Sequence, residues 1–330
     1  MARELRRRAA DAVVRAGRSC FKGTAVGRLP LAGTVLRWFV QAGHGDGEVL
    51  AAFRGLELAV PTASASIAAG LLGGFYEERE LDLFEQLCAR RRTVVDVGAN
   101  LGAYACLAAR AMPADGLLVC YEPAPGNLAR LEANLRRNPG RPGPAVRIEP
   151  HAVGPCEGRT TLRLAEDIGL HRVAAGDTAG HGGGGGGGLA VRQVALDARL
   201  PVLFAEHGGP RPVDVLKIDV EGYDVHALRG ARRLLVRDRP VLFAEFCPPQ
   251  LAGCGADAEE FVELLAEAYE EIHVVDTARR TVTACAPSAL LAPTYRSRLV
   301  NVVAAGRDED RALLARWAGR KARGRSQPVR

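Results

Sequence analysis

The sequence feature that most constrains the fold is the stretch from Thr93 to Gly102, which reads TVVDVGANLG. Its first half is an apolar run interrupted by Asp96, and such a run is typical of a buried β-strand. Its second half is a glycine turn, and a helical run follows over 104–111. A strand, a glycine turn and a helix together open the first ligand crevice of an α/β sheet. The sequence therefore predicts a ligand-binding turn here, where glycine lets the backbone approach closely because it has no Cβ.

The rest of the chain repeats this alternation of strand and helix. Further strands are expected at 116–121, 146–148, 213–218, 241–245, 272–275 and 299–304, and helices at 64–72, 76–88, 127–138, 225–235 and 258–268. Such an order predicts a mainly parallel sheet with helices on both faces. An extra antiparallel pair is expected at 160–164 and 190–196. The seven glycines at 182–188 between them are expected to form a mobile surface loop, either a substrate lid or an inert loop of variable length.

Three regions are expected along the chain. Residues 1–75 form an N-terminal extension of helices with one β-hairpin at 49–53 and 56–60. Residues 76–306 form the main α/β domain, and residues 307–330 form a basic C-terminal helix or tail. The division follows from the change of pattern, because the alternation of strands and helices is confined to the middle region.

The basic character of the chain belongs to its two ends. The net charge is +6 and the isoelectric point is about 9.0. Residues 1–37 hold nine basic and two acidic side chains, and residues 311–330 hold seven basic ones and no acid, so that the region between them is net negative. Basic ends can contact nucleic acid or anionic lipid. A solvated helix and tail is the simpler interpretation, since the body has no basic stripe interleaved with aromatic residues.

Cysteine usage and hydropathy predict a cytoplasmic protein. None of the eight cysteines forms a Cys-x-x-Cys pair, so free thiols in a reducing compartment are expected and no metal site is predicted. No apolar run approaches the ~20 residues needed to cross a bilayer. The first residues carry charges and no apolar core, so no signal peptide is expected.

The glycine turn favours S-adenosylmethionine (SAM) over a dinucleotide. An acidic side chain two residues before Gly98 suits a ligand with a positive group, and the pattern G-x-G-x-x-G of NAD sites is absent. SAM needs polar partners for its methionine part, a carboxylate for its ribose and an apolar slot for its adenine. The residues expected to supply them are Asp96 with Gly98, Asn100 and Gly102, then Glu122, which lies 20 residues past Gly102, and finally His151 and Ala152 with Val153.

A second group of acidic residues follows the later strands. Asp219 and Glu221 follow the strand at 213–218, and Glu245 ends the strand at 241–245. On a continuing strand Asp219 and Glu221 share one face, because side chains alternate along a strand. These three are the candidate catalytic residues: one can order an acceptor and another can take its proton. His171 and His226 are further candidate bases.

Four blocks of the chain resemble the FkbM-like family of SAM-dependent methyltransferases, over about residues 76–306. The blocks are VVDVGANLGAYACLAAR, CYEPAPGNLARLEANL, LKIDVEGYDVHALRGARRLL and RPVLFAEF. The resemblance implies a Rossmann-like class I methyltransferase sheet of seven strands, mainly parallel with the last antiparallel. It implies O-methylation of a hydroxyl on a sugar, glycan or polyketide-type metabolite. The SAM site it implies is Asp96, Gly98, Asn100, Gly102 and Glu122, with Asp219 and Glu221 near the reacting methyl group.

Three other functions stay open on the sequence alone. A nucleic-acid methyltransferase would use the basic ends, although the Asn/Asp-Pro-Pro-aromatic run typical of base amino methylation does not follow the strand at 213–218. A catalytically silent scaffold would keep the fold and lose SAM, and a dehydrogenase would bind NAD instead. The acceptor, the oligomeric state and the role of the N-terminal extension are not determined by the sequence.

Overall fold

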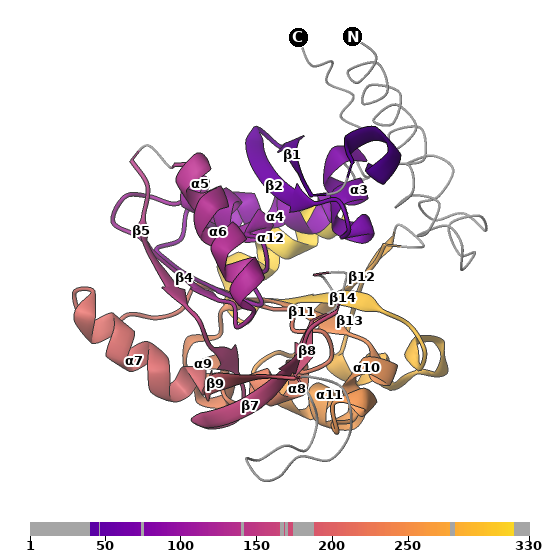
Figure 1. The fold of residues 1–330 in the computed structure, drawn as a ribbon. Coiled ribbons are helices and arrows are strands. Elements are labelled where there is room, and N and C mark those ends of the chain that lie inside the picture. Colours follow the sequence, from indigo (N-terminus) through magenta and orange to yellow (C-terminus); the bar gives the residue numbers. More distant parts are fainter. Residues whose placement is uncertain are drawn as a thin grey trace.

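An eight-stranded sheet carries the glycine turn at the end of one of its inner strands (Figure 1). The computed structural model describes residues 40–45, 47–73, 76–139, 142–165, 168, 171–173, 188–277 and 281–319. The strands of this sheet are β3 Thr93–Val97, β4 Leu117–Tyr121, β5 Ala145–Glu149, β10 Val215–Ile218, β11 Val241–Phe246, β12 Ile272–Asp276, β13 Thr281–Cys285 and β14 Val300–Ala304. Their spatial order is β13, β12, β14, β11, β10, β3, β4 and β5.

The strand directions confirm the class I methyltransferase sheet expected from the sequence. β11, β10, β3, β4 and β5 are parallel neighbours, and β14 lies antiparallel between β11 and β12. These seven strands are the predicted set, with the last one antiparallel. β13 adds an eighth strand at the edge, antiparallel to β12. This strand was not predicted, because its side chains are mostly exposed and give no apolar signal.

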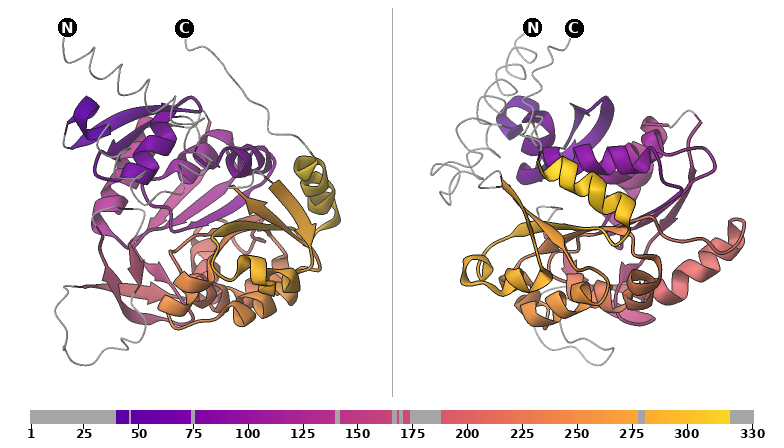
Figure 2. Two further views of the ribbon diagram at one scale, coloured as in Figure 1. Left: turned by 90° about the vertical axis from the view of Figure 1, so that its right-hand side faces the viewer. Right: turned by 180° about the vertical axis from the view of Figure 1, so that it is seen from behind.

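Helices cover both faces of the sheet, and each face has its own hydrophobic core (Figures 1 and 2). One face packs against α4 Glu78–Cys88, α5 Ala103–Ala111, α6 Pro125–Arg137 and α12 Asp308–Ala318. The other packs against α7 Leu196–Glu206, α8 Asp224–Arg229, α9 Arg232–Asp238 and α11 Ala258–Ala266. All five residues of β3 are buried, and Val94 and Val95 enter different cores because neighbouring side chains on a strand point to opposite faces.

The prediction of one helix over 225–235 is wrong, because two helices, α8 and α9, divide this stretch. At the break, a Cβ on Gly230 would lie 2.0 Å from the backbone oxygen of Gly154, so only glycine fits there. Asp197 accepts the backbone N–H groups of Arg233 and Leu234, at 2.9 and 2.8 Å, and thereby caps the start of α9.

A separate four-stranded sheet stands beside the carboxyl ends of the main strands. It consists of β6 Ala152–Val153, β7 Gly158–Arg163, β8 Arg172–Val173 and β9 Leu189–Val194. The predicted antiparallel pair is confirmed as β7 and β9. The expected strand end at Leu196 is wrong, because that residue begins α7. Residues 182–187 of the glycine run lie outside the described residues, so neither a lid nor an inert loop is tested.

The N-terminal hairpin is confirmed and is fastened to the glycine turn. β1 Glu48–Phe53 pairs with β2 Leu56–Pro61, and α3 Ala65–Gly73 follows. Asn134 on α6 accepts the N–H of Ala59 at 2.8 Å and donates to the carbonyl of Leu101, also at 2.8 Å. The expected helical segments before residue 40 and the tail after residue 319 lie outside the described residues. The division into three regions stays a prediction.

The described cysteines are free thiols, and Cys106 and Cys120 are among those that are buried. Within the described ranges, no helix combines the length and the apolar character that a membrane crossing requires. The cytoplasmic location stays a prediction.

Candidate functional site

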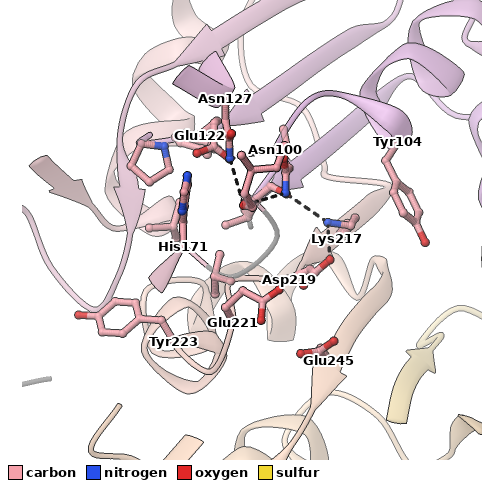
Figure 3. A pocket seen from close by; sticks show the side chains of 18 of the residues that line it. Asn100, Tyr104, Glu122, Asn127, His171, Lys217, Asp219, Glu221, Tyr223 and Glu245 are labelled. Atoms are coloured by element: carbon pink, nitrogen blue, oxygen red, sulfur yellow. Dashed lines mark hydrogen bonds and ion pairs between the residues drawn. The ribbon is translucent and has the colours of Figure 1, made fainter. Parts of the chain in front are cut away.

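A cavity of about 270 Å³ opens at the carboxyl ends of β3, β4, β10 and β11 (Figure 3). This edge of a parallel sheet is where α/β proteins bind ligands. The structure brings eight of the predicted site residues to its wall: Gly98, Asn100, Glu122, His151, Ala152, Asp219, Glu221 and Glu245. Two predicted cofactor-binding residues, Asp96 and Gly102, do not line it.

Asp96 and Gly102 support the wall from behind. Asp96 is fully buried within β3, and its burial raises the pKa of its carboxyl above the usual value. Gly102 adopts φ 94° at the start of α5, where a Cβ would lie 2.7 Å from the Cδ1 atom of Leu131 on α6. Their contacts therefore hold the turn from behind the wall, and their predicted part in cofactor binding stays a prediction.

The glycine turn is fixed by the backbone of two neighbouring strands. The N–H groups of Gly98 and Ala99 both donate to the carbonyl of Tyr121 at 3.0 Å. Gly98 has φ 77°, and a Cβ there would lie 1.9 Å from the backbone oxygen of Asp219. Glycine is needed here because two backbone segments of the same chain, at the ends of β3 and β10, lie close together.

Glu122 joins the end of β4 to the turn. It is 5% exposed, and its two carboxylate oxygens accept the N–H groups of Asn100 at 2.9 Å and Ala124 at 2.8 Å. Burial raises the pKa of Glu122 to about 7, although these two hydrogen bonds oppose the shift. Asn100 itself has φ 52°, a conformation that places its N–H toward the carboxylate. Two backbone donors thereby orient the Glu122 carboxylate in the cavity wall.

Beyond Glu122 the wall becomes largely apolar. Its lining there comes from Ala152, Val153, Leu162, Ile168 and Val173, most of them on the second sheet. His151 also lines this end, and burial lowers the pKa of its imidazole, so the ring is neutral at pH 7. Asn127 on α6 is 2% exposed, and its Oδ1 atom has no hydrogen-bond partner among the described residues. A flat apolar group with polar edges fits this end.

The opposite end of the cavity is acidic, and Asp219, Glu221 and Glu245 lie there (Figure 3). Glu77 lines the same end, and we call these four residues the acidic end. Asp219 directly follows β10, but the strand does not continue to Glu221. Glu221 has φ 55° and Gly222 has φ 93°, so the chain turns there. The predicted alternation along one strand is therefore wrong, while the turn still brings Asp219 and Glu221 to the same wall.

Lys217 lies under the acidic end and was missed by the sequence analysis. Its Nζ atom lies 3.5 Å from Asp96 Oδ1, 3.2 Å from Asp219 Oδ2 and 3.4 Å from the carbonyl oxygen of Gly98. It also lies 5.0 Å above the ring of Tyr104. Burial alone would lower the pKa of Lys217, but the carboxylates around it raise the pKa above its ordinary value. Its position in the sequence, a lysine inside an otherwise apolar strand, is the signal by which it could have been predicted.

Glu77 comes from a part of the chain where no site residue was predicted. It precedes α4, has φ 37°, and accepts a hydrogen bond from the hydroxyl of Tyr104. Burial, followed by the nearby charge of Asp219, raises the pKa of Glu77 to about 8. The local sequence reads as an acidic helix start, so only the fold reveals this position.

The other two glutamates of the acidic end hold protons readily. Burial and then Asp219 raise the pKa of Glu221 to about 8 and that of Glu245 to about 11. The Oε2 atom of Glu245 is shielded from solvent and has no hydrogen-bond partner within the described ranges. Glu221 receives a hydrogen bond from the side-chain amide of Gln250 at 3.1 Å. Several carboxyl groups in one low-dielectric space cannot all be ionised without a cation among them.

The two histidines predicted as candidate bases are placed differently. His171 lines the cavity at its apolar end, and its Nδ1 atom accepts the N–H of Ala165 at 3.0 Å. His226 lies outside the lining, stacked on Tyr223 and 2.8 Å from the carbonyl of Cys254. Among the residues that the structure describes, no three His, Cys, Asp or Glu side chains are grouped to hold a metal ion.

Comparison with protein families gives one match. The family described as "Methyltransferase FkbM domain" matches residues 96–272, which includes the glycine turn, Glu122 and the acidic residues after β10 and β11. Among curated proteins, no sequence matches this chain.

Solved structures give more distant likenesses. Methyltransferase FkbM from Methylobacillus flagellatus KT is 16% identical with a TM-score of 0.37, and the match covers 74% of this chain and 55% of that one. The O-methyltransferase TomG from Streptomyces achromogenes, in complex with SAM, is 15% identical with a TM-score of 0.40, covering 74% and 86%. The O-methyltransferase from Bacillus cereus is 16% identical with a TM-score of 0.37, covering 69% and 80%. At this distance the likenesses say nothing about the acceptor.

Proposed function

Because the chain belongs to the FkbM methyltransferase family, we propose that it transfers a methyl group from SAM to a hydroxyl oxygen of a sugar, glycan or polyketide-type metabolite. The observation that carries the SAM site is the Glu122 carboxylate, which two backbone N–H groups hold in the cavity wall beside the glycine turn. A carboxylate at the end of the second strand of such a sheet is placed to accept hydrogen bonds from a ribose diol.

The residues around Glu122 fit the remaining parts of SAM. The apolar wall of Ala152, Val153 and Leu162 suits an adenine ring, and the unpartnered Oδ1 atom of Asn127 can accept a hydrogen bond from its amino group or from the ribose. No side chain caps the start of α5, whose first residues, Ala103 and Tyr104, line the cavity. The N–H groups of a helix N-terminus attract a carboxylate, and the methionine part of SAM carries one.

When bound, SAM supplies a methyl group already activated on a sulfonium, so the protein mainly has to align the acceptor. The reacting oxygen then needs to lie about 3–3.5 Å from the methyl carbon. The ends of β10 and β11 lie on the far side of the turn from Glu122, as the order β4, β3, β10, β11 requires. We therefore place the acceptor at the acidic end.

We assign the proton-accepting role to Glu221. A general base works best when its pKa lies near the working pH, and the pKa of Glu221 is about 8. Asp219 is held by Lys217 and steadies the floor beneath the acceptor. Glu245, with a pKa of about 11, stays protonated in the empty cavity at pH 7 and can donate a hydrogen bond. Asp96 and Gly102 act indirectly by holding the turn.

Calorimetric titration of the purified chain tests the cofactor site. SAM and S-adenosylhomocysteine (SAH) are expected to bind, with NAD as the negative control. Glu122→Gln is expected to weaken SAH binding about tenfold or more, because a hydrogen bond to a charged group contributes about 1.5–3 kcal/mol. The matched control is Glu132→Gln on α6, a half-exposed position whose side chain pairs with Arg136.

The result also separates the other functions. A folded protein that binds neither SAM nor SAH would be a silent scaffold, and one that binds NAD instead would be a dehydrogenase. Transfer of a labelled methyl group from SAM to hydroxylated sugars or polyketides, and not to RNA or DNA, is the outcome that the proposal requires.

A further inference from the structure

The charge balance of the cavity is uneven. Five carboxyl groups line it, whereas Lys217 is the single lysine or arginine among its described lining residues. Lys217 is already engaged by Asp219 and by Asp96 behind the wall. Glu122 is engaged by two backbone N–H groups at the other end. Lys217 also lowers the pKa of Glu77 and of Glu221 through space, but it forms its ion pairs with the two aspartates. Three glutamates therefore have no cation of their own within ion-pair distance among the described residues: Glu77, Glu221 and Glu245.

These three glutamates converge on one space from different elements. Glu221 comes from the turn after β10 and Glu245 from the end of β11 (Figure 3), and Glu77 comes from the start of α4. Each has only neutral partners or none among the described side chains: a tyrosine hydroxyl for Glu77, an amide for Glu221, and nothing for the buried Oε2 of Glu245. A shielded carboxylate oxygen without a partner costs free energy that a bound ligand can recover.

The place of these groups in the sheet assigns them to the acceptor and not to SAM. Glu122 directly follows β4, and Glu245 lies one residue before the end of β11, three strands away. At about 4.8 Å between neighbouring strands, the two positions are about 14 Å apart. If Glu122 and the apolar wall take the nucleoside, Glu245 is left for the acceptor, and Glu77 lines the same acidic end.

We propose, resting on the methyltransferase function above, that the acceptor is an amino alcohol or amino sugar whose ammonium group binds between Glu245 and Glu77. The hydroxyl to be methylated then faces Glu221, which lies in the turn after β10, the strand next to β11. Because β10 and β11 are neighbours, with about 4.8 Å between strands, one small acceptor can present its ammonium group to Glu245 and its hydroxyl to Glu221. Tyr76 and Tyr104 also line this end, and aromatic faces favour a bound ammonium group.

This arrangement predicts that binding of an amine releases protons. The empty acidic end holds protons at pH 7, since the pKa of Glu77 is about 8 and that of Glu245 is about 11. An ammonium group placed between them favours their ionised forms and lowers both pKa values. A neutral ligand of the same shape leaves the protons in place.

Calorimetry on the SAH-loaded full chain tests the proposal. The probes are glucosamine, galactosamine and 2-aminocyclohexanol, each paired with its N-acetyl derivative and measured at pH 7 in phosphate and in HEPES. At least one amine is expected to bind at least tenfold more tightly than its N-acetyl partner, with a heat that depends on the buffer because protons are released. Glu245→Gln and Glu77→Gln are each expected to weaken amine binding about tenfold or more. The control is Glu263→Gln, an exposed position on α11.

Three outcomes of this experiment would overturn the proposal. Equal binding of amines and their N-acetyl partners overturns the proposal, as does amine binding that Glu245→Gln and Glu77→Gln leave as tight as Glu263→Gln does. Absence of amine binding to the SAH-loaded protein also overturns it. SAH binding is measured first in the same cell, so a failure of the methyltransferase proposal appears there and is distinguished from a failure at the acceptor.

Discussion

Replacing Lys217 with methionine tests how the floor of the site is held together. The substitution keeps the length and apolar stem of the side chain and removes its charge. Nζ lies 3.5 Å from Asp96 and 3.2 Å from Asp219, and the Asp96 side chain is fully buried. The variant therefore leaves Asp96 as a buried carboxyl without its cation, while Asp219 is partly exposed and can reach water.

The magnitude follows from these distances. Each pair contributes about 5 kcal/mol of Coulomb attraction at an effective dielectric constant of about 20. Much of that attraction is offset by the cost of taking the charges out of water, and removing one partner of a buried pair typically costs about 3–5 kcal/mol. We expect Lys217→Met to lower the free energy of unfolding by that amount at pH 8.

Urea denaturation followed by circular dichroism measures the loss. The double variant with Asp96→Asn is expected to recover part of it, because the orphaned charge is removed. Arg136→Met is the control, since its pair with Glu132 is exposed and contributes at most about 1 kcal/mol. A loss below about 1 kcal/mol for Lys217→Met, or a double variant less stable than the sum of the two single ones, would refute the reasoning.

The pH dependence of this loss has a definite sign. Burial already raises the pKa of Asp96, and removal of Lys217 raises it further. A carboxyl whose pKa is higher in the folded state than its unfolded value of about 3.9 destabilises the fold increasingly as the pH rises from the unfolded value to the folded one. The loss caused by Lys217→Met is therefore expected to be smaller at pH 5 than at pH 8.

Three further outcomes are expected. Gly98→Ala should prevent folding or cost several kcal/mol, because its Cβ would lie 1.9 Å from the backbone oxygen of Asp219 at φ 77°, and thermal melting measures this. Asn134→Ala should cost roughly 2–4 kcal/mol in urea denaturation, because it leaves buried backbone groups of the hairpin and of the glycine turn without partners. The rate of methyl transfer at low acceptor concentration should rise as the pH rises through about 8, where Glu221 loses its proton, and Glu221→Gln should abolish that rise.

The main sheet was predictable because its signal is local. β3 spans 93–97 as expected, since a short apolar run bounded by polar residues and a glycine turn leaves few other structures. α7 was missed because Leu196 continues the apolar pattern of β9 into a helix start. β13 was missed because an exposed edge strand gains its stability from backbone pairing with β12, which the sequence does not display.

The site was predictable where one motif carries several groups and not where distant elements meet. Glu122 and Asn100 belong to adjacent motifs, and the structure joins them by a hydrogen bond. Asp96 was expected to face the ligand, yet it pairs in register with Lys217 across β3 and β10 and turns toward that side chain. Glu77 reaches the cavity only because α4 packs on α5, a tertiary contact that no local pattern encodes.

Backbone strain marks the same place by an independent route. Five non-glycine residues among those described have positive φ, and three of them, Glu77, Asn100 and Glu221, line the cavity. A non-glycine residue in this conformation costs about 1 kcal/mol or more, and such residues persist where the surroundings require a particular direction of the chain. Local propensity would favour glycine at all three positions. The chain instead keeps one amide and two carboxyl side chains there, as the proposed binding of a polar and positively charged ligand requires.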